Sequence, residues 1–185
     1  GYAQDFIELI KKILPIIKKY NLKIITNAGG ANPIACREEL IKILGGDVKI
    51  AVIEGDDIFN DLDFLHSNGT SFENMESGEK FVNIKKHVTS ANAYINSFSI
   101  AEALKADAQI VLAGRVSDPG LALGPCIYEF DWKENEYDKL ASGTLAGHIT
   151  ECGAQCTGGN FSKWMDVKGL DNLGYPIAVI NEDGS

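Results

Sequence analysis

Hydrophobic residues recur every three or four positions at the start of the chain, with lysines between them. This spacing predicts an amphipathic helix over Gln4–Tyr20. The run Leu22–Thr26 follows, and its β-branched residues predict a strand. After a loop of small and amide residues, a second helix is predicted from Pro33, which suits a first helical turn, to about Gly45.

The alternation of strand and helix continues along the rest of the chain. Short apolar runs predict strands, and longer periodic or capped segments predict helices. The range 61–80 is polar, acidic and glycine-bearing, so a surface loop is expected there. The other predicted strands are Val48–Ile53, Ala91–Asn96, Ala108–Ala113 and a last one ending at Val179, and the other predicted helices are Ile58–Leu65, Ser99–Lys105, one from Pro119 and Tyr137–Cys152.

Helices between short apolar strands are typical of α/β proteins. We therefore predict an open, mainly parallel sheet with helices on both faces, formed by a single domain over residues 1–185. In such sheets ligands bind beyond the carboxyl ends of the strands. A functional site is thus expected in the loops that follow the predicted strands.

Acidic residues outnumber basic ones, 26 to 17, which gives a formal net charge of −9. No lysine or arginine cluster could neutralise a row of phosphates, so nucleic acid and anionic membranes are not expected partners. No apolar run approaches the ~18 to 20 residues that a bilayer span needs, and no signal peptide is recognised, so a cytoplasmic location is expected. The four cysteines are too few for a disulfide framework and are expected to be reduced thiols.

Three segments of the sequence carry a family resemblance. They are the loop Thr26–Pro33, the strand end and turn Leu112–Pro119, and the run Gly147–Phe161, which reads GHITECGAQCTGGNF. In this order and spacing they resemble the AtuA-like family of acyclic terpene utilisation proteins, formerly classed as a domain of unknown function. The third segment is the most specific of the three.

Family members are longer than this chain, so the resemblance implies the middle part of a longer protein. A fragment that lacks the first strand of its sheet would expose an edge, so contact with copies of the chain or with a partner subunit is expected. The family's link to degradation of acyclic terpenoids implies an enzyme acting on a branched acyl or carboxylate substrate, with a coenzyme A thioester as one form of it. Hydratase, lyase and transferase chemistry all stay open. So do two non-catalytic functions: a subunit or scaffold of a catabolic complex, and a small-molecule-binding module.

The loop after the first predicted strand offers Asn27, Gly29, Gly30 and Asn32 as ligand contacts. Small residues let backbone N–H groups approach an anionic or carbonyl group at the start of the next helix, and the asparagines can add side-chain amides. A tight turn without a ligand is the alternative. The loop matches neither G-x-G-x-x-G nor a Walker loop, and no cofactor is predicted.

Arg115 and Asp118 follow the apolar strand Ala108–Ala113. The guanidinium can hold a substrate carboxylate or phosphate through two hydrogen bonds, with Asp118 orienting it. The alternatives are an internal pair of these two residues, or a cap of the next helix by Ser117 or Asp118.

His148, Glu151 and Cys152 lie within one turn of each other on the predicted helix Tyr137–Cys152. They can act as a general acid/base group, with the carboxylate orienting the imidazole and the thiol beside it. Close packing of His148 among small residues is one alternative. Zinc is another, but the helix is expected to end before Cys156, and no metal is predicted.

Thr157, Gly158, Gly159 and Asn160 form a second glycine-rich loop. Its backbone amides can surround an oxyanion or phosphate, or they can do no more than end the helix. We predict that the two glycine loops, the arginine and the histidine meet at one rim and bind a single negatively charged ligand.

Overall fold

A small parallel sheet lies at the centre of the molecule. The computed structural model describes residues 1–185, except for the side chain of Asp47. Within that description the strands are β1 (Ile24–Thr26), β2 (Ile50–Ile53) and β3 (Ile110–Ala113), in the order β1-β3-β2. Both outer strands run parallel to β3, and Ile24 and Ile50 both pair with Ile110. The predicted open parallel sheet is therefore confirmed.

Two helices cover one face of the sheet. They are α1 (Gln4–Tyr20) and α2 (Pro33–Leu44), which both match the sequence prediction. Their apolar stripes pack on side chains that alternate positions of β3 send to this face, because successive strand residues point to opposite sides. The fully buried side chains of this cluster are Ile10, Ile17, Cys36, Leu40, Ile110 and Leu112.

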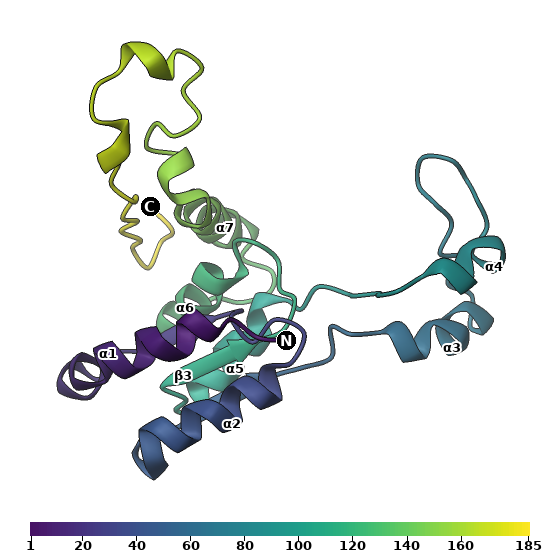
Figure 1. The fold of residues 1–185 in the computed structure, drawn as a ribbon, viewed down its shortest axis with the longest axis horizontal. Helices are drawn as coiled ribbons and strands as arrows, with labels where there is room; N and C mark the ends of the chain where they lie inside the picture. Colours follow the sequence, from purple (N-terminus) through teal and green to yellow (C-terminus); the bar gives the residue numbers. More distant parts are fainter.

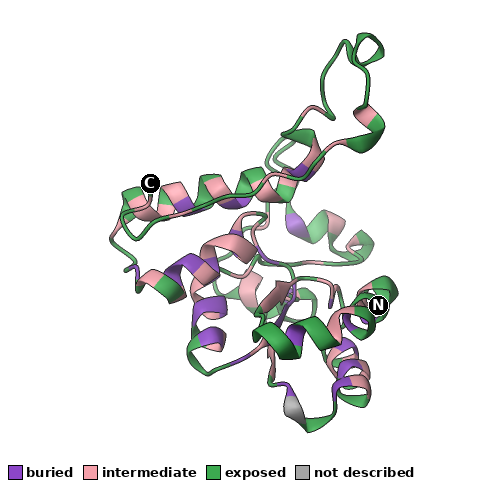
Figure 2. Cartoon of the chain, turned by 90° about the vertical axis from the view of Figure 1, so that its left-hand side faces the viewer, coloured by how far each residue is buried: buried purple, intermediate pink, exposed green. Residues whose placement is uncertain are grey.

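The opposite face is covered by α5 (Ser97–Lys105) and α6 (Gly120–Phe130). Ile100 and Leu104 of α5 pack against Val111 and Ala113, the residues of β3 that alternate with those of the first face. The next helix, α7 (Tyr137–Cys152), packs on α6 rather than on the sheet (Figure 1). Buried residues gather where these helices meet the sheet and each other (Figure 2). The molecule thus has helices on both faces, as predicted.

Residues 58–91, called the arm here, leave the sheet after β2 and return before α5. A hydrogen bond from Ile58 N–H to the Ala91 carbonyl, 3.0 Å, closes its base. The arm holds α3 (Leu62–Ser67) and α4 (Phe81–Ile84), which stand away from the sheet in Figure 1. Within the predicted surface loop 61–80, α3 is regular and the chain after it is mostly exposed. The ring of Phe81, packed against His66 and Phe72, gives the arm an apolar centre of its own.

Residues 153–185 continue beyond α7 and return along it. They contain single 3-10 turns, η4 (Gly153–Gln155), η5 (Trp164–Asp166) and η6 (Leu170–Asn172), joined by extended chain. Buried Trp132 holds the returning segment in place, because its indole Nε1–H donates to the Glu182 carbonyl at 2.8 Å. None of the described helices is long and apolar enough to cross a membrane.

Two local predictions from the sequence are wrong, and one alternative does not hold. Ala91–Asn96 is not a strand: it forms isolated bridges, Asp57 with Asn92 and Ile95 with Val116, because its backbone groups are divided between the loops after β2 and β3. No strand forms at Val179, where the extended chain is exposed and has no ladder partner within the described structure. The N-cap position of α6 is Pro119, and neither Ser117 nor Asp118 caps that helix through its side chain.

Candidate functional site

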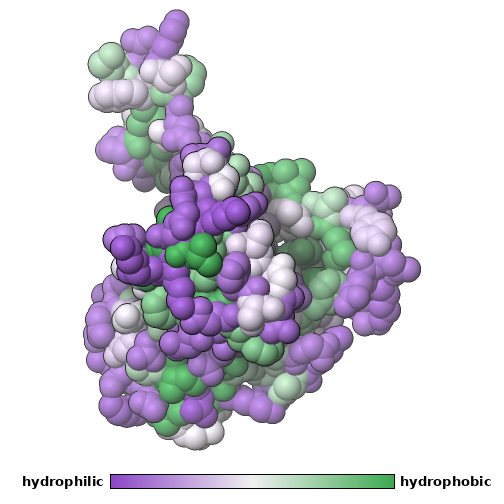
Figure 3. All heavy atoms as spheres, turned by 90° about the vertical axis from the view of Figure 1, so that its right-hand side faces the viewer, coloured by the Kyte–Doolittle hydropathy of each residue, from purple (hydrophilic) through white to green (hydrophobic). Residues whose placement is uncertain are grey.

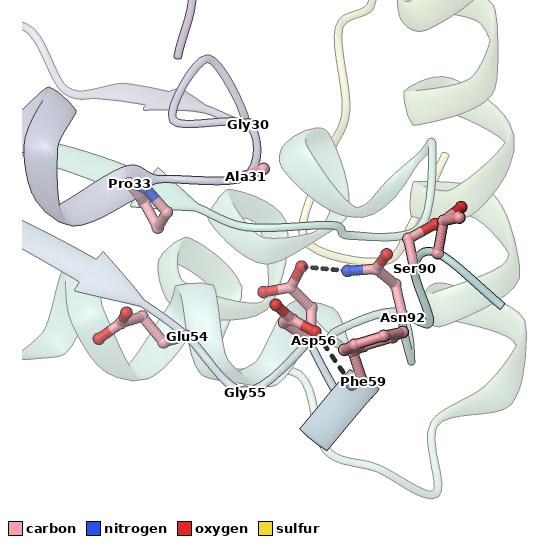
Figure 4. A pocket seen from close by; sticks show the side chains of 11 residues that line it. Gly30, Ala31, Pro33, Glu54, Gly55, Asp56, Phe59, Ser90 and Asn92 are labelled. Carbon is pink, nitrogen blue, oxygen red and sulfur yellow. Dashed lines mark hydrogen bonds between the residues drawn. The ribbon is translucent and has the colours of Figure 1, made fainter. Parts of the chain in front are cut away.

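A cavity of about 470 Å³ lies beyond the carboxyl ends of the strands (Figure 4). The loop after β1 leads to α2 on one face and the loop after β3 leads to α6 on the other, and ligands of open α/β sheets bind where neighbouring loops diverge in this way. The residues that line the cavity come from the loops after β1 and β2 and from the base of the arm: Gly30, Ala31, Pro33, Glu54, Gly55, Asp56, Asp57, Phe59, Thr89, Ser90 and Asn92.

Asp56 is the most constrained of these residues. Its side chain is buried, and its Oδ2 accepts a hydrogen bond from the Arg115 backbone N–H at 2.9 Å. The same oxygen accepts a second bond from Asn92 Nδ2 at 3.1 Å, which Figure 4 shows. The carboxylate also lies over Gly114, where a Cβ would come within 2.1 Å of Asp56 Oδ1. The residue after β3 must therefore be glycine for this carboxylate to occupy its place. Asp56 links the loops after β2 and β3 with the base of the arm.

In the glycine loop after β1, the backbone N–H groups already donate to carbonyl groups of the protein. Gly30 N–H donates to the Asn27 carbonyl at 2.9 Å, and Asn32 N–H donates to the Gly29 carbonyl at 3.0 Å. Ala31 N–H donates to the Gly1 carbonyl at 3.2 Å. Gly30 lines the cavity, but an anion at these amides would have to compete with the bonds that they already make.

Asn32 caps α2, since its Oδ1 accepts from Ala35 N–H at 3.0 Å. We expect Asn32→Ala to lower the free energy of unfolding by about 1 kcal/mol, as loss of an N-cap does. Asn32→Asp keeps the acceptor oxygen and removes the amide NH₂, so its stability in urea should match that of the wild type. A loss of stability in Asn32→Asp equal to that in Asn32→Ala would contradict the capping role.

Arg115 is exposed at the edge of the site. Its Nη2 donates to the Tyr94 hydroxyl at 2.6 Å, and its guanidinium lies 5.1 Å from the centre of the Tyr94 ring. Among the described residues Arg115 forms no ion pair with Asp118, so the internal pair considered from the sequence does not hold. Asp118 instead lines a hollow of about 260 Å³ between α6 and α7, together with Glu151.

His148, Glu151 and Cys152 come together at the last turn of α7. Cys152 Sγ lies 3.8 Å from His148 Nε2 and 3.6 Å from Glu151 Oε2. His148 is exposed, so the alternative in which it is a packed core residue is wrong. The small residues on the other face of α7 make the close packing contact instead. A Cβ at Gly147 would lie 2.5 Å from the Pro119 carbonyl oxygen.

The Cys152 thiol is not activated as a nucleophile in this setting. Desolvation raises its pKa above that of a free thiol, and the neighbouring Glu151 carboxylate and Cys156 thiol raise the pKa further. The thiolate is the nucleophilic form of cysteine. The thiol therefore stays protonated at neutral pH.

The second glycine loop closes the end of α7. Gly159 N–H donates to the Ala154 carbonyl at 2.8 Å, and the Thr157 hydroxyl donates to the Gly174 carbonyl at 2.5 Å. Asn160 Nδ2 donates to Gln155 Oε1 at 2.9 Å. Gly158 has φ +132°, a conformation that a side chain rarely adopts. None of these four residues lines the cavity at the strand ends.

A family model described as the acyclic terpene utilisation family protein AtuA matches residues 1–185. The chain belongs to the AtuA family. Comparison with curated proteins and with solved structures found no significant match. The match to the AtuA family thus covers the whole chain and includes all three segments that carried the resemblance.

The AtuA-family chain divides the predicted site residues between two places. Gly30 lines the cavity at the strand ends, and Arg115 reaches its wall through a backbone N–H. Asp118 and Glu151 line the hollow between α6 and α7 instead, and neither the cavity nor the hollow is lined by both groups. The role of His148, Glu151 and Cys152 in proton transfer stays a prediction.

The sequence prediction missed Asp56, Asn92 and Tyr94. Asp56 carried a signal, because it stands in an acidic run directly after a predicted strand. Asn92 and Tyr94 carried none, since they lie in a segment predicted as a strand. They reach the site because the arm folds back to the end of β2.

Proposed function

We propose that this chain is the substrate-binding domain of an enzyme that acts on a branched acyl or carboxylate substrate in acyclic terpene utilisation. Membership of the AtuA family supports the metabolic context. The cavity beyond the strand ends is the proposed binding site, because this is where open parallel sheets bind their ligands.

The observation that carries the proposal is the buried carboxylate of Asp56, held by Arg115 N–H and the Asn92 amide at the wall of the cavity. A buried charge is costly unless hydrogen bonds compensate it, and here two donors from separate loops do so. Such a group gives the wall a fixed geometry. It can then orient a polar group of the substrate.

The charges around the cavity suggest how the substrate would lie. Glu54, Asp56 and Asp57 are among the lining residues, and no lysine or arginine is. A negatively charged group would be repelled inside, whereas a carbonyl or hydroxyl group can meet the side chains of Thr89 and Asn92. We therefore place the acyl group inside, and the carboxylate or the phosphates of a coenzyme A thioester outside, next to Arg115.

The test is thermal unfolding of the intact protein with a panel of branched acyl-CoA esters and the matching free acids. A ligand that binds the native state should raise its stability by about 2.7 kcal/mol at a concentration of 100 times Kd. Asp56→Asn should abolish this stabilisation. Asp171→Asn, an exposed control, should keep it. If no compound of the panel stabilises the wild type, or if Asp56→Asn responds like the wild type, the proposal fails.

A non-catalytic subunit or scaffold is the second candidate. It is favoured by large apolar side chains that remain exposed after α7, Ile177 at 91% and Val179 at 83% among them. Hydrophobic residues also form several separate patches on the face seen in Figure 3. Exposed apolar surface of this kind is typical of protein contacts. Two results would favour this function over the enzyme. The wild type would bind no ligand of the panel, and both the wild type and Asp56→Asn would associate stably with another subunit.

A further inference from the structure

The last turn of α7 gathers three side chains with different metal-binding atoms. His148 and Cys152 are four residues apart, which places them on the same face of the helix, and Glu151 stands beside them. The imidazole nitrogen, the thiol sulfur and a carboxylate oxygen all lie within 4.8 Å of one another. Two of these side chains are exposed and the third is half-buried, so an ion can reach them from solvent.

The distances between these atoms fit a tetrahedral ion. Zinc bonds of about 2.3 Å to sulfur and about 2.0–2.2 Å to nitrogen or oxygen place neighbouring ligand atoms roughly 3.6 Å apart. Cys152 Sγ lies 3.8 Å from His148 Nε2 and 3.6 Å from Glu151 Oε2.

We propose that the end of α7 binds one Zn²⁺ ion through His148 Nε2, a carboxylate oxygen of Glu151 and the sulfur of Cys152, with the fourth position open to water. This site lies outside the cavity at the strand ends and does not depend on the proposed substrate. It replaces the prediction from the sequence that no metal is bound.

The position of Cys156 explains why the sequence alone argued against a metal. Helix α7 does end at Cys152, four residues before Cys156. The chain then continues in the tight turn η4, in which Cys156 N–H donates to the Gly153 carbonyl at 3.0 Å. Cys156 is exposed, and its sulfur is not one of the three ligand atoms that lie within 4.8 Å of one another. A water molecule can fill the fourth position of a zinc ion that has three protein ligands, so neither Cys156 nor His66 or His87 of the arm is needed.

The ligand set selects the kind of ion. Thiolate and imidazole ligands suit zinc and related transition metals, whereas magnesium and calcium take oxygen ligands. On binding, the Cys152 thiol gives its proton to solvent and its sulfur donates an electron pair to the ion, with no oxidation or reduction. One thiolate and one carboxylate balance the two positive charges of the ion. Three protein ligands leave one coordination position for water, as in catalytic zinc sites.

The test is a titration of the reduced, intact protein with Zn²⁺ and with Co²⁺, whose visible spectrum reports tetrahedral geometry and thiolate bonds. The wild type should bind one equivalent and give a thiolate-to-cobalt charge-transfer band. His148→Ala and Cys152→Ser should each weaken metal binding by at least about tenfold. Substitution of residues that only hydrogen-bond to a metal ligand already lowers the affinity by about that factor. Cys156→Ser keeps all three proposed ligands, so it should bind the ion and give the same charge-transfer band as the wild type.

Two controls separate the site from general effects. His87→Ala removes an exposed histidine of the arm and should bind metal like the wild type. Asp56→Asn changes the cavity and the loops that Asp56 links, but none of the zinc ligands, so it should also bind metal normally. Failure of the substrate proposal therefore leaves this one intact. The metal proposal is overturned if the reduced wild type takes up no ion, or if His148→Ala and Cys152→Ser bind as the wild type does.

Discussion

Replacement of Leu112 by alanine is expected to lower the free energy of unfolding by about 2–5 kcal/mol, the range for large-to-small changes in a core. Leu112 is fully buried on the central strand and packs in the cluster formed with α1 and α2. Both neighbours of β3 are strands, so the backbone there cannot easily move to fill the cavity. Denaturation in urea, followed by circular dichroism, measures the change.

The matched control is Leu145→Ala, because Leu145 is 62% exposed on α7. Its effect should stay within about 0.5 kcal/mol, as expected for a surface position. Equal losses in Leu112→Ala and Leu145→Ala would show that the sheet is not the centre of the core.

Gly147→Ala is expected to destabilise the protein by about 1–3 kcal/mol, the usual cost of overpacking. The added Cβ would lie 2.5 Å from the Pro119 carbonyl oxygen and 2.9 Å from its Cα, both backbone atoms at the start of α6. To make room, α6 and α7 would have to move apart. Thermal unfolding of the variant against the wild type measures the loss.

The sign of this effect makes Gly147→Ala informative. In an open helical position, glycine to alanine stabilises a protein by up to about 1 kcal/mol, because alanine has the higher helix propensity. Thr144→Ala, at an exposed position one turn earlier, serves as the control for general changes to α7. A gain of stability in Gly147→Ala would mean that the two helices are not in close contact.

The predictions from the sequence succeeded where local patterns were strong and tertiary structure agreed with them. Helix α1 follows a sustained three- and four-residue repeat, and β3 is a continuous apolar run whose four residues are all buried. Helix α2 has both a proline at its start and glycine at its end. Each of these signals lies within the element that it predicts.

The errors arose where distant contacts decide the structure. Ala91–Asn96 has strand-like residues, but its partners are two separate loops, and no short-range pattern shows that. For the site, the sequence placed chemistry at the strand ends, which is where the cavity lies. It could not show that the Asp56 carboxylate would occupy the space above Gly114, or that Arg115 would contribute its backbone, because both follow from how three loops converge.

The arm would affect how a ligand enters the cavity at the strand ends and how it is held there. One side of the cavity belongs to the loops of the sheet, and the other includes Thr89 and Ser90 at the end of the arm. Because the arm has few contacts with the body, its opening costs less free energy than global unfolding. A molecule that touched both sides would bind only when they are together, and part of its binding energy would be spent on restricting their relative motion.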